Sequence, residues 1–120
     1  MSSGVAHDLI QQSLLGDAVD EGPVAVFVAD EDRRYLAVNR YACMLLGYTR
    51  EELLGLTVTD VAVNTGAAED YDQMMREGGH AGLAILRRKD GSELPMNFRA
   101  AEATVGGMAV YVGVCWPVGE

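Results

Sequence analysis

The stretch Tyr35–Gly55, YLAVNRYACMLLGYTREELLG, constrains the fold more than any other part of the chain. A strand-like segment ends at Asn39, whose side-chain oxygen suits the start of a helix because it can accept from an orphan backbone N–H. Gly47 fits a left-handed helix end, and Thr49 with Glu52 forms a capping box for a second helix. Two helices this short are unstable alone. They must therefore pack on a larger surface that the rest of the chain builds.

Hydrophobic periodicity and turn residues predict the remaining elements. Apolar residues four apart indicate a helix near the N-terminus, and Asp90-Gly91 between two alternating runs indicates a hairpin. The segment 57–63 favours a strand by propensity. The predicted elements are a helix over 5–20, strands over 24–29 and 34–38, helices over 40–46 and 49–55, a helix over 67–77, and strands over 81–88, 93–101 and 108–116.

Two motifs resemble the PAS domain family, the small sensor modules of signalling proteins. The first consists of Val38-Asn39, Gly47-Tyr48, Thr49, Glu51-Glu52-Leu53 and Gly55, and the second is the charged hairpin Leu86–Ser92. The resemblance covers residues 22–116. It implies an α+β PAS fold, in which a five-stranded antiparallel sheet has its first and last strands near the centre and helices on one face. It also implies a short helical turn over 57–63.

The resemblance divides the chain into three parts. Residues 1–21 are expected to form an N-terminal amphipathic helix, residues 22–117 the PAS domain, and residues 118–120 a short tail. The predicted N-terminal helix, or a partner, is expected to cover the sheet face that the other helices leave open.

Composition and charge exclude several classes of function. The net charge of −9 argues against nucleic acid and anionic membrane surfaces as partners, since both need cationic residues. No apolar run approaches the roughly 18 residues that a membrane helix needs, and no signal peptide is recognisable. A cytoplasmic location is therefore expected. The two cysteines, Cys43 and Cys115, lie in apolar segments and are expected to be buried, without a disulfide.

Nothing in the sequence predicts catalysis or a metal site. The histidines, His7 and His80, have no nucleophile or ligand cluster around them. PAS relatives that form a covalent flavin adduct carry a cysteine on the helix after the position of Gly55, and residues 55–59 contain none. Haem-binding relatives use a histidine on the long helix, whereas residues 67–77 contain none. We therefore expect no enzyme activity and no cofactor, with haem and covalent flavin disfavoured.

An apolar pocket between helices and sheet is the candidate ligand site. Methionine is flexible and polarisable, so a pocket lined by it can adapt to a loose apolar guest, and Tyr71 is the expected polar handle. The same residues also suit a solid core, and the sequence leaves both alternatives open. The candidate wall consists of Val26, Val28, Tyr71, Met74, Met75, Leu83, Ile85, Met96 and Phe98.

The N-terminal helix carries more apolar residues than one face of a sheet could cover. They predict a homodimer joined through this helix, and the alternative is a monomer whose helix covers its own sheet. The predicted interface consists of Leu9, Ile10, Leu14, Leu15, Ala18 and Val19. Two functions remain open: a sensor that binds a small apolar or metabolite-like ligand, and a ligandless dimerisation or protein-interaction module. Either would act through dimer contacts, an output domain or a protein partner.

Overall fold

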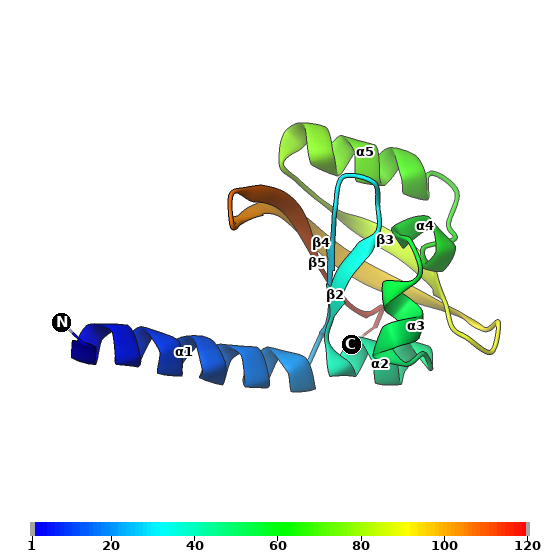
Figure 1. Ribbon diagram of the computed structural model, residues 1–120. Coiled ribbons are helices and arrows are strands. Elements are labelled where there is room, and N and C mark those ends of the chain that lie inside the picture. The colour runs from blue at the N-terminus through cyan, green and yellow to red at the C-terminus, as the bar shows by residue number, and fades with distance from the viewer. Residues whose placement is uncertain (1, 120) are drawn as a thin grey trace.

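The computed structural model describes residues 2–119, with side chains described from His7 onward. Five antiparallel strands form one sheet in the order β2-β1-β5-β4-β3, and four of the helices lie on one of its faces (Figure 1). This arrangement confirms the predicted PAS fold. The elements are α1 Ser2–Glu21, β1 Ala25–Ala29, β2 Tyr35–Val38, α2 Arg40–Leu46, α3 Arg50–Leu54, α4 Val58–Val61, α5 Ala67–Glu77, β3 Gly79–Arg87, β4 Glu93–Val105 and β5 Met108–Pro117.

The caps predicted from local sequence are present. The Asn39 side chain accepts from the backbone N–H of Ala42, and Gly47 ends α2 in the left-handed region with φ of 81°. Thr49 and Glu52 form the expected reciprocal capping box of α3. The segment 57–63 contains the short helix α4, as the family resemblance implied and against its strand propensity.

The core lies between the sheet and helices α2–α5. Strand β1 turns alternate residues inward, so that Ala25, Phe27 and Ala29 are buried. Helix α5 turns Tyr71 and Met74 toward the sheet. The largest side chains with essentially no exposed surface are Leu46, Leu53, Val61 and Met96.

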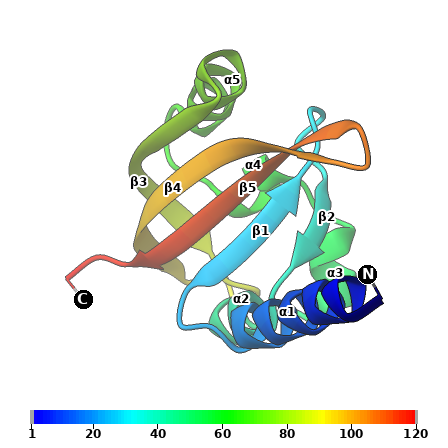
Figure 2. The ribbon, with the colours of Figure 1, turned by 90° about the vertical axis from the view of Figure 1, so that its left-hand side faces the viewer.

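Helix α1 projects away from the rest of the domain as an arm (Figures 1 and 2). The molecule measures 51 Å along its longest axis against 30 and 28 Å along the others. The arm leaves the second face of the sheet uncovered, contrary to the alternative in which it folds back on its own domain. Its apolar residues also surround the helix. Leu9 and Ala18, for example, are separated by about two and a half turns and so lie on opposite sides.

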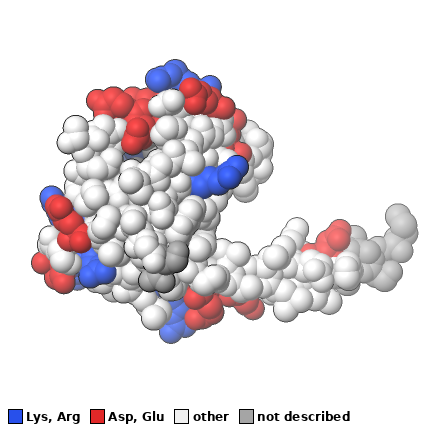
Figure 3. Space-filling model, turned by 180° about the vertical axis from the view of Figure 1, so that it is seen from behind, with Lys and Arg blue, Asp and Glu red and all other residues white. Residues whose placement is uncertain are grey.

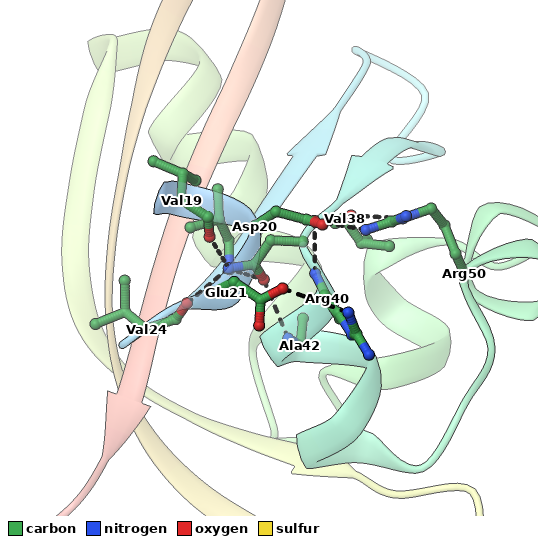
Figure 4. A network of polar contacts seen from close by, with 10 residues as sticks. Val19, Asp20, Glu21, Val24, Val38, Arg40, Ala42 and Arg50 are labelled. Atoms are coloured by element: carbon green, nitrogen blue, oxygen red, sulfur yellow. Dashed lines mark hydrogen bonds and ion pairs between the residues drawn. The ribbon is translucent and has the colours of Figure 1, made fainter. Parts of the chain in front are cut away.

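A polar network fixes α1 to the domain (Figure 4). The Asn39 amide donates to the carbonyl of Val19 at 2.7 Å. The carboxylate of Asp20 accepts from the backbone N–H of Arg40 at 2.9 Å and from the Arg50 guanidinium at 2.6 Å. These contacts join the last turn of α1 to the starts of α2 and α3, and they set the direction of the arm.

Among the described residues, no helix is both long enough and apolar enough to cross a membrane.

Candidate functional site

A cavity of about 110 Å³ lies between the inner face of the sheet and helices α4 and α5. Strands β1, β2, β3, β4 and β5 all contribute to its wall, so that the site depends on the complete sheet. Its lining is almost wholly apolar. The lining residues are Phe27, Ala29, Tyr35, Val58, Ala62, Asn64, Ala67, Asp70, Tyr71, Met74, Ala84, Leu86, Phe98, Ala100, Tyr111, Gly113 and Cys115.

Aromatic residues from five elements line the cavity, and Phe98 is the one from β4. Phe27 of β1 and Tyr35 of β2 lie with ring centroids 5.3 Å apart. Tyr71 of α5 meets Tyr111 of β5 edge to face, with centroids 5.9 Å apart. Edge-to-face pairing is a favoured arrangement of aromatic quadrupoles. The rings are therefore paired with one another and contribute flat, apolar surfaces to the cavity wall.

Most polar groups around the cavity already have partners. The Tyr71 hydroxyl donates to the carbonyl of Asp30 at 2.7 Å, and burial together with Asp30 raises the pKa of this tyrosine. The Asn64 side-chain oxygen accepts from the backbone N–H of Ile85 at 3.2 Å. Burial also raises the pKa of the Cys115 thiol to about 12, so this cysteine is protonated at neutral pH.

The β1–β2 turn is tied to α5 beside the cavity. The guanidinium of Arg33 contacts the Asp72 carboxylate at 2.7 Å, and the Tyr71–Asp30 hydrogen bond lies next to this ion pair in sequence. In the first turn of α5, Asp70 lies 3.7 Å from His80 of β3. Polar contacts of its N-terminal half thus hold α5 over the cavity.

Three of the predicted ligand-binding residues line the cavity: Tyr71, Met74 and Phe98. Met96 is fully buried and Met75 is partly buried against the core, but neither reaches the cavity wall.

The other four predicted wall residues need a correction, because they lie on the opposite face of the sheet. Val26 and Val28 alternate with the inward residues of β1, and Leu83 and Ile85 alternate with the inward Ala84 and Leu86 of β3. Leu83 is 63 % exposed. Because side chains alternate along a strand, an error of one residue in the assumed pattern moves the whole set to the other face.

The sequence analysis missed the residues that shape the cavity most, namely Phe27, Tyr35, Tyr111 and Cys115. One usable signal was present. Phe27 and Tyr35 are the bulkiest residues of their strands, and large aromatic residues favour buried positions with room for a ring. Placing Phe27 inward would have turned Val26 and Val28 outward.

No group of three or more His, Cys, Asp or Glu side chains within residues 7–119 could hold a metal ion.

The comparisons with known proteins agree on the family. A model of the PAS domain family matches residues 23–115. A search of curated proteins finds no match to the chain. Among solved structures, the PAS domain of an HTR-like protein from Haloarcula marismortui superposes with a TM-score of 0.82 at 19 % identity, covering 98 % of this chain and 100 % of that one.

Two further structures are similar. A PAS domain from a two-component sensor histidine kinase matches with a TM-score of 0.81 at 15 % identity, over 92 % of this chain and 98 % of that one. The LOV domain of a blue-light activated histidine kinase from Erythrobacter litoralis EL346 matches with a TM-score of 0.69 at 20 % identity, over 82 % and 99 %. At these sequence identities, the similar structures establish the fold alone. Because the family model matches most of the length of the chain, the chain belongs to the PAS domain family.

Proposed function

We propose that this domain is a cytoplasmic sensory module, without enzyme activity of its own, that takes a small and largely apolar guest into its cavity. The observation that carries the proposal is the apolar cavity of about 110 Å³ between sheet and helices. Close-packed interiors contain few voids larger than a water molecule. An apolar cavity of about 150 Å³ in another protein binds benzene or xenon, so this volume suits a guest of similar size.

The size and lining of the cavity support a guest smaller than the cofactors known from some PAS domains. A tricyclic flavin or a haem needs far more room than this volume offers. Cys115, the only cysteine in the lining, has a pKa raised to about 12 and is a poor candidate for a reactive thiolate. No histidine belongs to the described lining. These features support a guest other than either cofactor.

The contacts around α5 offer a route for a signal. A ligand can shift a conformational equilibrium only by its differential affinity for the two states. A guest under α5 would act on Tyr71 and Met74, which line the cavity, and thereby on the Tyr71–Asp30 hydrogen bond and the Arg33–Asp72 ion pair. Similar folds occur in sensor histidine kinases, which supports a role in signal transduction.

Xenon is expected to bind the wild-type chain saturably, and Gly113→Val is expected to weaken this binding roughly tenfold or more, equivalent to about 1.4 kcal/mol. Gly113 lines the cavity, and a Cβ built on it meets no other atom within 4 Å. The valine side chain should therefore occupy the cavity without displacing its walls. Heteronuclear NMR under xenon pressure measures the binding through amide shifts of the lining residues.

Val112→Ile is the matched control, because Val112 is the neighbour of Gly113 in β5 and points to the other face of the sheet. It should leave xenon binding unchanged. A wild-type chain without saturable xenon shifts, or a Gly113→Val chain with undiminished ones, would contradict the ligand-sensor proposal and favour the ligandless interaction module.

We further propose that the domain pairs with a second copy through α1. Its apolar side chains are exposed, Leu15 by 64 % and Leu9 by 61 %, and the surface of the arm is mostly uncharged (Figure 3). Burying four such side chains would yield a gross gain on the order of 6–12 kcal/mol per helix. Association costs offset much of this gain, so a dimer with micromolar affinity is expected.

The double substitution Leu14→Glu and Leu15→Glu is expected to weaken dimerisation by at least about tenfold. Two charges would have to be desolvated in an apolar interface, and burying charges without partners is costly. Light scattering or analytical ultracentrifugation at tens of micromolar measures the effect. Gln12→Glu with Ser13→Glu adds the same charge at exposed polar positions of the same helix and serves as the control. A wild-type chain that stays monomeric at this concentration would contradict the proposal.

A further inference from the structure

One tyrosine hydroxyl in the cavity lining has no hydrogen-bond partner among the described residues. Three tyrosines line the cavity, and two of their hydroxyls are engaged: that of Tyr71 donates to the Asp30 carbonyl at 2.7 Å, and that of Tyr111 to the Glu102 carboxylate at 3.5 Å. The hydroxyl of the third, Tyr35, makes no hydrogen bond to any described residue. The fully buried side-chain atoms without a partner in the described part of the chain are the Nε atoms of Arg33 and Arg88. The Tyr35 hydroxyl is not one of them, so it keeps some accessible surface and is free to form a hydrogen bond.

The Tyr35 side chain points from β2 into the cavity. The residue is only 6 % exposed and lies on the inner face of the sheet beside Phe27. Burial raises the pKa of its hydroxyl, and the nearby Cys115, Tyr71 and Asp60 raise this pKa further. Tyr35 itself belongs to the cavity lining, so its hydroxyl, which has no partner among the described residues, is available to a guest.

We propose that the guest is a neutral, single-ring aromatic compound with one hydrogen-bonding substituent directed at the Tyr35 hydroxyl. This inference rests on the proposed function of the cavity as a ligand site. The volume of about 110 Å³ suits one ring. The rings of Phe27, Tyr71 and Tyr111 offer faces and edges against which an aromatic guest can stack or meet edge to face.

The electrostatics of the site select a neutral compound. Asp70 belongs to the lining, and acidic side chains, with basic ones beside them, lie on the surface at the end of the molecule where α5 lies (Figure 3). The negative charge of Asp70 would repel an anionic guest. A cationic guest would lose its hydration among apolar walls, while Asp70 already lies 3.7 Å from His80. An uncharged hydroxyl or carbonyl avoids both costs, since a tyrosine hydroxyl can donate or accept.

The test measures the binding of phenol and of toluene to the whole wild-type chain and to its Tyr35→Phe variant. Phenol has a hydrogen-bonding substituent where toluene has a methyl group. Dissociation constants come from NMR chemical-shift titrations. Removing the Tyr35 hydroxyl is expected to weaken the binding of phenol about fivefold to tenfold relative to the binding of toluene. This change in affinity corresponds to the loss of one hydrogen bond. Tyr35→Phe removes an atom without a protein partner, so the fold should be retained. In the wild-type chain, intermolecular NOEs should connect the phenol ring to the Tyr35 ring.

Tyr111→Phe is the matched control, because its ring lines the same cavity while its hydroxyl bonds to Glu102. It should leave the ratio of phenol to toluene affinity unchanged. If toluene binds and the ratio of phenol to toluene affinity is the same in the wild-type chain and in Tyr35→Phe, the inference is overturned. The proposed ligand-sensor function would still stand. If neither compound binds the wild-type chain but xenon does, the ligand class is wrong. If none of the three binds, the proposed function fails as well.

Discussion

Asn39→Ala is expected to lower the free energy of unfolding by roughly 3 kcal/mol or more, since each buried polar group left unpaired costs about 1–3 kcal/mol. The Asn39 side chain is 5 % exposed and makes four hydrogen bonds. Its oxygen accepts from the N–H groups of Val26 and Ala42 at 2.9 and 3.0 Å. Its amide donates to the carbonyls of Val19 and Val24 at 2.7 and 2.9 Å. Alanine would leave all four backbone groups without this partner.

Asn39→Asp distinguishes the hydrogen bonds that the side-chain oxygen accepts from those that the side-chain amide donates. Aspartate keeps the accepting oxygen, and it is a good helix N-cap, but it places a carboxylate against two carbonyl oxygens. We expect it to destabilise the domain at neutral pH and to do so less as the pH falls, because a protonated carboxyl group can donate to one carbonyl. Urea unfolding followed by circular dichroism measures both variants.

Asn97→Ala is the control for this pair. Asn97 is a partly buried asparagine of β4 whose side chain makes no hydrogen bond to the described residues. Its replacement should change the free energy of unfolding by less than about 1 kcal/mol. Similar losses in Asn39→Ala and Asn97→Ala would show that the network does not hold α1, β1 and α2 together.

Leu53→Ala is expected to cost about 2–5 kcal/mol of stability, as is typical of truncating a buried leucine. Leu53 has no exposed surface and belongs to the hydrophobic core. Its neighbour Leu54 lies in the same short helix and is 39 % exposed. Leu54→Ala should therefore cost much less, about 1 kcal/mol or below, because partly exposed side chains lose less burial on truncation.

The comparison of these two leucines tests which face of α3 packs on the sheet. Thermal or urea unfolding measures the stability of the two variants. Helix propensity cannot explain a difference, since both variants make the same substitution in the same helix. A larger loss for Leu54→Ala than for Leu53→Ala would mean that α3 packs on β2 through its other face.

Local sequence determined helices α2, α3 and α5, whereas α4 forms against the strand propensity of its segment. The caps at Asn39, Gly47 and Thr49 each depend on hydrogen bonds or backbone conformations within a few residues, so short motifs are sufficient to predict them. Helices α2 and α5 begin and end at the predicted residues. The order of strands and helices and the family resemblance then sufficed for the fold.

The tertiary structure alone decided which face β1 and β3 bury and what shape the site has. Strand β1 is apolar at every position, so its sequence has no alternation to show that Phe27 points inward and Val26 outward. That choice depends on pairing with β2 and β5. The direction of α1 likewise depends on contacts of Asp20 with Arg50 thirty residues away. A cavity is a space left where several elements fail to fill a common volume, and no single segment of sequence encodes such a space.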